Sequence, residues 1–578
     1  MTTLVRTSAS ARRCSPATLK SSRTRSRGGV VCTRRTLVVA SDASDDVQPA
    51  LEDATTIGTN LGEVSTSASS ATSVTSVTSA NNAVPYHKEV KAPKPASQPP
   101  ISFLSVVLNT SFDKEIAKLA LPALMTTLLD PVMTAIDAAI VGRLGTPQLA
   151  AVGACTVLYN FSNFVFNFLL YTTTPRIAAA ASKSDMSAVS KIASQGLWVA
   201  ITIGTITGIS LAIACPVLFE MMGTSPEVMT YAVPFLRVRC LSSPAIMMTY
   251  VMSGVFRGFK DTRATLVSST WSNIAHILLD AVCIFGLGMG AVGAAVATSL
   301  SLWLNWSILF SNIVKSGYLK VSDMATYPSI AEVTPMLRNG VLLSARSLLA
   351  MSTLMFATKM AAGLGAAGLA AHEIIRQIWV VSNQAFTSLD IATQSLVAFY
   401  KGKGDRQSAG RVFLRTNTLT VFVSVIIMGS LIAGRNALPQ LFTQDPVVKT
   451  LVASVIPLIA IYMPMDGMAS VFDGFLMGSE RTGALSKVMA CTSMMCALAL
   501  VVQTLDCWPM TVTVLSVWVA IKILTLGRLF GNGYAVFRGK DSDVFFGGIS
   551  FKNERREKGG DEREDDGEAT APAAPVFA

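Results

Sequence analysis

The chain has 578 residues, of which 51% are hydrophobic and only 14% are charged. A typical soluble domain has about 25% charged residues, so this composition excludes an ordinary soluble enzyme. The formal net charge of +11 does not indicate nucleic-acid binding, because the basic residues lie in the N-terminal segment and in short clusters between long apolar runs. This segregation of charge is typical of a protein that crosses a membrane several times.

Residues 1–40 are predicted to be a transit peptide. They hold nine lysine and arginine residues, many serines and no acidic residue. A basic, serine-rich and acid-poor segment without a secretory apolar run is typical of organelle targeting. The high serine and threonine content favours a plastid, with a mitochondrion and a disordered cytosolic tail as alternatives. Residues 41–112 contain too few large apolar residues to fold, so they are predicted to be a disordered linker.

Twelve apolar runs follow, each long enough to cross the hydrocarbon core as a helix. They predict an all-α membrane protein with spans at 115–141, 148–172, 190–219, 228–253, 264–286, 290–314, 336–362, 367–399, 411–434, 447–472, 483–505 and 509–536.

The twelve spans divide into two lobes of six. Residues 113–314 form the N-lobe, residues 315–335 link the lobes, and residues 336–538 form the C-lobe. Residues 539–578 are predicted to be a disordered charged tail. Lysine and arginine gather in the loops after the even-numbered spans, which places those loops and both termini on one face. In a plastid envelope that face would be the stromal one.

The two lobes resemble each other in sequence at a fixed offset of 220 residues. Asn163 matches Asn383, and Asp185 matches Asp405. Glycines and prolines keep the same register, as in Gly254-x-x-x-Gly258 and Gly474-x-x-x-Gly478. Repeats of six spans have the same orientation in the membrane, and the interface between such repeats is where transporters usually bind their substrates.

Ionisable residues within the spans are the main candidates for function, because a charge in the hydrocarbon core is costly. Asp137 lies in the first span and Asp390 in the eighth, while His276 and Asp280 stack at i and i+4 in the fifth. A carboxylate removed from water can exchange a proton near physiological pH, or bind sodium beside other oxygens. The alternative is that each aspartate lies at a span end or is satisfied by a neighbouring helix. Weaker candidates nearer the span ends are Asp130, Asp466 and Asp473.

Two pairs of residues are candidates for lining a substrate cavity between the lobes. Tyr159 and Trp379 are aromatic residues that would suit a planar substrate, and Asn163 and Asn383 follow them by one helical turn. The alternative is that these side chains pack within a lobe or face lipid. Nine scattered cysteines and three histidines do not predict a metal centre. The sequence also lacks a clustered catalytic motif such as H-E-x-x-H, so we expect no enzyme activity.

Several motifs resemble the multidrug and toxic compound extrusion (MATE) family. In the N-lobe these are residues 136–145 (IDAAIVGRLG) and 254–262 (GVFRGFKDT). In the C-lobe residues 370–374 (AAHEI), 389–396 (LDIATQSL) and 472–478 (FDGFLMG) resemble the DinF-like branch, which includes plant plastid carriers. The resemblance covers about residues 113–538 and implies the family's twelve-helix fold.

The resemblance also implies roles for particular residues. Asp137 and Asp280 match the N-lobe carboxylates that couple ion movement to export, Thr298 matches a hydroxyl of the same cluster, and Asp390 matches a C-lobe carboxylate. The family usually has asparagine where this chain has His276. An imidazole titrates near neutrality and could share a proton with Asp280, which favours protons over sodium as the coupling ion; alternatively, His276 only replaces the asparagine as a hydrogen-bond donor.

The predicted function is therefore secondary antiport of a small organic solute, an organic cation or drug or a phenolic or organic acid, across an organellar membrane. The exchanged ion is H⁺ or Na⁺, and no other cofactor is expected. We expect a monomer in the lipid bilayer of the chloroplast envelope, with the mitochondrial inner membrane as the alternative, and no nucleic-acid partner. A lipid-linked saccharide flippase of related architecture is the alternative function, for which a more cationic cavity is expected.

Overall fold

The computed structural model describes residues 101–102, 110–504, 512–538, 545–546 and 549–550. The predicted transit peptide and most of the predicted linker and tail lie outside the described residues. In the described part, helices account for almost all regular structure, which confirms the all-α prediction. The helices are α2 (Asp113–Val141), α3 (Thr146–Phe164), α4 (Phe168–Ser182), α5 (Met186–Met221), α6 (Pro226–Cys240), α7 (Ser243–Gly258), α8 (Arg263–Asp280), α9 (Gly290–Lys315), α10 (Ile330–Ala362), α11 (Gly365–Gly402), α12 (Arg406–Ala433), α13 (Pro446–Gly478), α14 (Thr482–Val502) and α15 (Val514–Arg538).

These helices follow the twelve predicted spans, but three spans are not a single α-helix. The second consists of α3 and α4, joined by the 3₁₀ turn η2 (Val165–Asn167). The fourth is broken at Leu241 and Ser242, and Pro244 occupies the first turn of α7, where a proline is tolerated because that turn needs no backbone donor. The fifth continues from α8 into the π-helix η3 (Ala281–Gly286).

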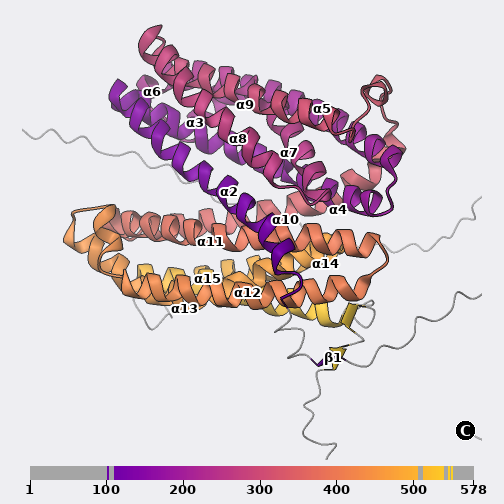
Figure 1. The fold of residues 1–578 in the computed structure, drawn as a ribbon. Coiled ribbons are helices and arrows are strands. Elements are labelled where there is room, and N and C mark those ends of the chain that lie inside the picture. The colour runs from indigo at the N-terminus through magenta and orange to yellow at the C-terminus, as the bar shows by residue number, and fades with distance from the viewer. Residues whose placement is uncertain (1–100, 103–109, 505–511, 539–544, 547–548, 551–578) are drawn as a thin grey trace, which may run out of the picture. The chain divides into compact units, whose positions relative to one another are not determined.

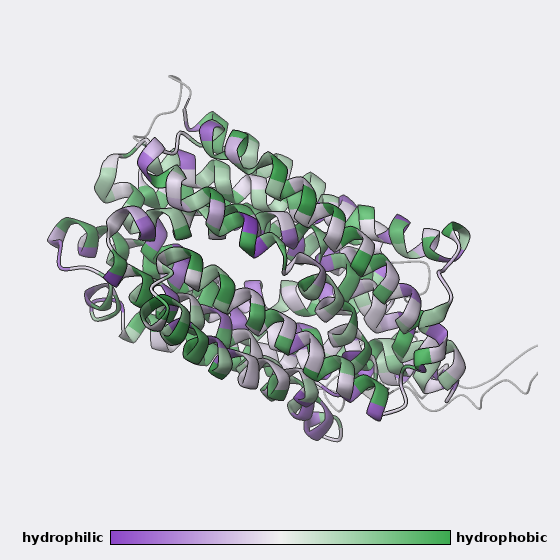
Figure 2. Ribbon diagram, turned by 90° about the horizontal axis from the view of Figure 1, so that it is seen from above, coloured by the Kyte–Doolittle hydropathy of each residue, from purple (hydrophilic) through white to green (hydrophobic). Residues whose placement is uncertain are grey.

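Nine helices of the described chain, with α3 to α4 counted as one, are long and apolar enough to cross a membrane. Many large aliphatic and aromatic side chains along them are exposed, such as Ile206, Ile213 and Phe422. Figure 2 shows hydrophobic residues along most of the helices, with hydrophilic residues more frequent near their ends. Apolar outer faces are what lipid requires of a spanning bundle.

The helices form two groups that follow the predicted lobes (Figure 1). In the N-lobe α4 and α5 pack on α7, α3 packs on α6, and α8 packs on α9. In the C-lobe α13 is central and packs on α11, α12 and α15. The groups meet where α2 and α4 contact α11. Helix α10 begins at Ile330, within the predicted linker, with a capping box formed by Ser329 and Glu332.

The internal repeat is visible in the backbone. Left-handed residues occur at the same places in both lobes, as at Gly145 and Gly365, Ser184 and Gly404, and Lys260 and Glu480. Asp185 and Asp405 each cap the following helix by accepting a hydrogen bond from the backbone of the third residue beyond, Ala188 and Ser408. The 220-residue register therefore describes equivalent positions of one fold used twice, as predicted.

Short pieces of the predicted linker and tail also have defined structure. The strands β1 (Ile101–Ser102) and β2 (Ile549–Ser550) pair in parallel. Phe545 and Phe546 are buried, and their rings contact Phe475 of α13. These contacts attach part of the predicted tail to the C-lobe.

Candidate functional site

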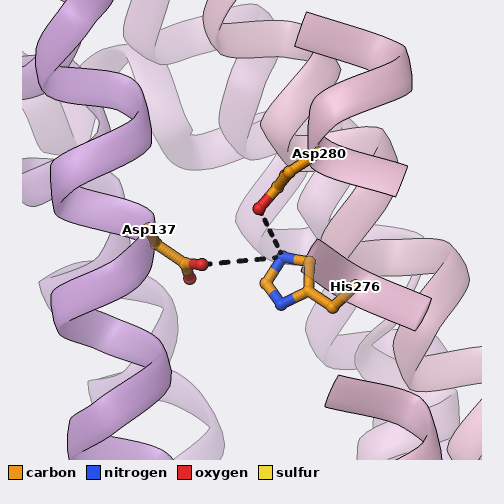
Figure 3. Close-up of side chains that lie close together, drawn as sticks. All are labelled: Asp137, His276 and Asp280. Atoms are coloured by element: carbon orange, nitrogen blue, oxygen red, sulfur yellow. Dashed lines mark ion pairs between the residues drawn. The ribbon is translucent and has the colours of Figure 1, made fainter. Parts of the chain in front are cut away.

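Four of the predicted site residues meet within the N-lobe. Asp137 comes from α2, His276 and Asp280 from successive turns of α8, and Thr298 from α9. His276 Nε2 lies 3.4 Å from Asp280 Oδ2 and 3.8 Å from Asp137 Oδ1. Thr298 Oγ1 lies 3.1 Å from the same nitrogen. Figure 3 shows both carboxylates directed at one edge of the imidazole ring. We call these four residues the N-lobe cluster.

Burial leaves the N-lobe cluster with unused hydrogen-bonding capacity. His276 is 4% exposed and Asp280 is 2% exposed, whereas the Asp137 side chain is about a third exposed. Asp137 Oδ1 and Asp280 Oδ1 are buried and have no hydrogen-bond partner among the described residues. Buried polar atoms normally have a partner, so the N-lobe cluster is suited to receive a proton or a cation.

Tyr159 and Asn163 lie elsewhere in the N-lobe and are almost fully buried. The Tyr159 hydroxyl is 2.8 Å from Ser242 Oγ, and the Arg239 guanidinium stacks 4.5 Å from the Tyr159 ring. Asn163 donates to the Tyr159 carbonyl oxygen. Arg239 is also close enough to act electrostatically on Asp137, His276 and Asp280, which links these residues to the N-lobe cluster.

Trp379 and Asn383 repeat this arrangement in the C-lobe. Asn383 donates to the Trp379 carbonyl oxygen at 2.8 Å, as Asn163 does to Tyr159. The Lys522 ammonium lies 5.5 Å from the centre of the Trp379 ring, just as the Arg239 guanidinium lies over the Tyr159 ring in the N-lobe. In both lobes a cation therefore stacks on an aromatic ring in the second span.

Trp379 belongs to a buried polar cluster around Asp466. Asp466 Oδ2 accepts from Lys522 Nζ at 2.7 Å and from Trp379 Nε1 at 3.0 Å, while Oδ1 accepts from Thr525 Oγ1 at 2.5 Å. Lys522 and Asp466 are both nearly inaccessible to solvent. A buried ion pair with this many additional hydrogen bonds is satisfied rather than poised to bind.

Asp390 is the C-lobe carboxylate that lacks such partners. It is buried, and its Oδ1 has no hydrogen-bond partner in the described chain. The neighbouring Asp473 is bonded by Arg346 of α10, and by Arg528 and Asn532 of α15 at 2.5 Å each. Asp390 does not join the N-lobe cluster, since the two sites lie in different lobes.

Sequence reasoning missed the basic residues of the last span. Lys522 and Arg528 lie within the predicted span 509–536, but neither is among the predicted site residues. The rule that an intramembrane charge is costly applies equally to both signs. That rule singles out Lys522 as a candidate. The sequence does not reveal that its partner is Asp466, which lies 56 residues away in the chain.

A cavity of about 120 Å³ lies between the lobes, and the four predicted cavity residues do not line it. Its walls come from α4, α10, α13 and α14. The polar side chains in the wall are Tyr171, Thr172, Arg176, Asn339, Glu480 and Thr482.

A family model described as MatE matches residues 122–282 and 343–502, one segment in each lobe and together more than half of the chain. The chain belongs to the MatE family. It is therefore a MATE transporter, and its twelve spans in two lobes are the architecture of that family. Membership of a transporter family confirms the prediction that the chain is not an enzyme.

Curated relatives and a solved structure agree with this membership. The chain is 28% identical to Protein DETOXIFICATION 44, chloroplastic, of Arabidopsis thaliana, over 73% of this chain and 81% of that protein. It is 27% identical to Protein DETOXIFICATION 45, chloroplastic, of the same plant, over 63% and 68%. The fold is similar to that of a multidrug resistance MATE family transporter solved in an outward-facing conformation, with a TM-score of 0.66 at 19% identity, covering 75% of this chain and 96% of that chain.

Proposed function

We propose that this MATE transporter is an antiporter that exports a small organic solute in exchange for protons. The N-lobe cluster carries the proposal, because it holds two carboxylates and an imidazole with unpartnered buried oxygens. Taking up a proton there changes the charge of a low-dielectric site, and a change of charge can bias the equilibrium between two lobe arrangements. Sodium is the second candidate ion, since the same oxygens can coordinate it.

The proposed substrate is an organic cation or drug, or a phenolic or organic acid. The flippase alternative receives no specific support from the described C-lobe, because its buried cations are matched by acids. Lys522 is paired with Asp466, Arg346 and Arg528 share Asp473, and Asp390 is a third buried acid of this lobe. Three cations therefore face three acids, which is not the more cationic cavity expected for a flippase.

We propose the chloroplast envelope as the membrane. Two relatives carry the word chloroplastic in their names, and the basic, acid-poor first 40 residues have the composition of a transit peptide. Import of the radiolabelled full chain into isolated chloroplasts tests this location. A protease-protected, shortened envelope protein is expected, whereas import only into mitochondria would contradict it.

The coupling mechanism is tested by efflux from proteoliposomes under an imposed pH gradient or an imposed sodium gradient. A fluorescent organic cation and an aromatic acid serve as substrates, and wild type is compared with Asp137→Asn and Asp280→Asn. Near-complete loss of gradient-driven efflux in both variants is expected, with the sodium gradient having no effect on wild type. Asp185→Asn is the matched control, because asparagine caps a helix as well as aspartate does.

Folding of each variant is checked by its elution as a single species from size-exclusion chromatography. If both cluster variants fold and carry substrate as wild type does, the N-lobe cluster is not the coupling site. Asp390, the unpartnered carboxylate of the C-lobe, then becomes the residue to test.

A further inference from the structure

The N-lobe cluster has the ligand set of a transition-metal site. Asp137, His276 and Asp280 each offer one ligand atom, and the three atoms lie within 4.8 Å of one another. One imidazole and two carboxylates suit Zn²⁺ and similar first-row divalent ions. An all-oxygen site would favour Mg²⁺ or Ca²⁺ instead. The nitrogen ligand is what distinguishes this site from one built for alkali or alkaline-earth ions.

The spacing of the ligand atoms is close to that required by a single ion. Zinc lies about 2.0–2.2 Å from nitrogen and oxygen ligands, so two ligands of one tetrahedral ion are about 3.4 Å apart. His276 Nε2 and Asp280 Oδ2 are separated by 3.4 Å, and Asp137 Oδ1 is 3.8 Å from the same nitrogen. Only Asp137 has to move, and it is the most exposed of the three side chains.

Independent evidence comes from hydrogen bonding in the N-lobe cluster. Asp280 is 2% exposed, yet its Oδ1 has no hydrogen-bond partner in the described chain. Thr298 donates its hydroxyl proton to the Ala294 carbonyl oxygen at 2.7 Å. Its oxygen therefore accepts from His276 Nε2, 3.1 Å away, when that nitrogen carries a proton. When the imidazole proton is on Nδ1 instead, Nε2 has a lone pair available for a metal ion. Among the described residues, no side chain donates a hydrogen bond to either carboxylate of the N-lobe cluster.

We propose that Asp137, His276 and Asp280 bind a divalent first-row transition-metal ion of the Zn²⁺ class, with the Thr298 hydroxyl beside it. An ion held there occupies the carboxylates that exchange protons in the proposed function. The metal is therefore a competitive inhibitor of coupling. This consequence rests on the proposed function, whereas binding of the metal itself does not. Arg239, stacked on Tyr159, is the nearby cation that opposes binding.

Metal binding is measured directly on the purified full chain in detergent, with Zn²⁺ alone in calorimetry and Co²⁺ alone in absorption spectroscopy. One ion per chain is expected, without the thiolate charge-transfer band that cysteine ligands give. His276→Asn and Asp280→Asn are expected to weaken binding by at least about tenfold, because even the loss of an outer-shell partner has an effect of that size. Mg²⁺ and Ca²⁺ in excess should not displace the ion.

His372→Asn is the matched control. His372 is buried in the C-lobe, and its Nε2 lies 3.2 Å from the Thr358 hydroxyl, much as His276 lies beside Thr298. No described carboxylate completes a three-ligand group around His372, so this variant should bind the metal as wild type does.

Three results would overturn the proposal: no binding to wild type, equal binding to a folded His276→Asn variant, or a thiolate band from Co²⁺. The transport assay distinguishes this failure from that of the proposed function. If Zn²⁺ binds as expected but neither Zn²⁺ nor the aspartate substitutions change coupled efflux, the metal site stands and the proposed coupling role is wrong.

Discussion

Arg415 of α12 donates to both carboxylate oxygens of Asp113 at the start of α2, with distances of 2.6 Å and 2.7 Å. This bidentate pair joins the C-lobe to the N-lobe. Two further contacts lie beside it: Tyr400 donates to Glu115, and the Lys260 ammonium lies 4.0 Å from the Phe399 ring. All three contacts are on the face predicted to carry the basic loops. The structure therefore has its two lobes in direct contact on that face.

Asp113→Asn should loosen this contact and increase the population in which the lobes are separated on the basic face. The pair is partly exposed, so its loss is expected to contribute about 1 kcal/mol, or about a fivefold shift in population. Spin labels are placed on Lys183→Cys and Lys403→Cys, one exposed loop position in each lobe. Double electron–electron resonance then measures the distance between the two labels. Glu332→Gln, which breaks the more exposed Lys191–Glu332 pair, should change the distances little; an unchanged distribution in Asp113→Asn would argue against the interlobe role.

Lys522→Met should destabilise the protein strongly, because it leaves Asp466 as an uncompensated buried charge. Removal of one partner of a buried pair typically costs about 3–5 kcal/mol. A large fall in the temperature at which the detergent-solubilised protein loses its monodisperse peak is expected. The double variant Asp466→Asn with Lys522→Met removes both charges and should recover most of the loss. If the single variant were as stable as wild type, the pair would not be desolvated in the membrane.

Gly474→Ala should destabilise the C-lobe where α13 crosses α11. A methyl group at this position would lie 2.7 Å from the Asp390 carbonyl oxygen and would also clash with the Asp390 carboxylate. Overpacking of this kind costs about 1–3 kcal/mol. The matched control is Gly429→Ala in α12, where nothing lies within 4 Å of the added methyl. Thermal stability of both variants is the measurement, and equal values would show that the crossing can widen without cost.

Thr298→Val tests whether the hydroxyl beside His276 contributes to coupling. Valine keeps the shape of threonine but removes the contact with Nε2, so the proposed function predicts an altered dependence of efflux on the imposed pH gradient. A shift of about threefold to tenfold in the half-saturating proton concentration is expected for the loss of one hydrogen bond. Thr358→Val, which removes the corresponding contact to His372, should leave the dependence unchanged. The same shift in both variants would contradict a specific role for Thr298.

The span pattern and the repeat could be predicted because both are written in local sequence. Apolar runs of sufficient length determine where helices cross the membrane, and the breaks at η2 and Leu241 only subdivide them. The meeting of His276 with Asp280 followed from helical periodicity. Its approach to Asp137 and Thr298 came only from the family resemblance.

The C-lobe clusters were harder to predict because their members are far apart in the chain and balance each other. Asp466 and Asp473 resemble coupling carboxylates in the sequence. Their basic partners on α15 make them satisfied ion pairs instead. Periodicity within one helix cannot identify a partner on another, so the sequence alone does not distinguish a paired intramembrane charge from an unpartnered one.

The left-handed residues that recur in both lobes, Ser184 with Gly404 and Lys260 with Glu480, have a consequence for engineering. Each pair marks a hairpin whose backbone hydrogen bonds are the same in both halves, as with Asp185 N to the Ala180 carbonyl and Asp405 N to the Tyr400 carbonyl. Such turns should be able to replace one another: the segment 183–185 should substitute for 403–405 without altering the helices on either side. The two lobes can therefore differ in charge and chemistry while the turns between their helices keep the same backbone conformation.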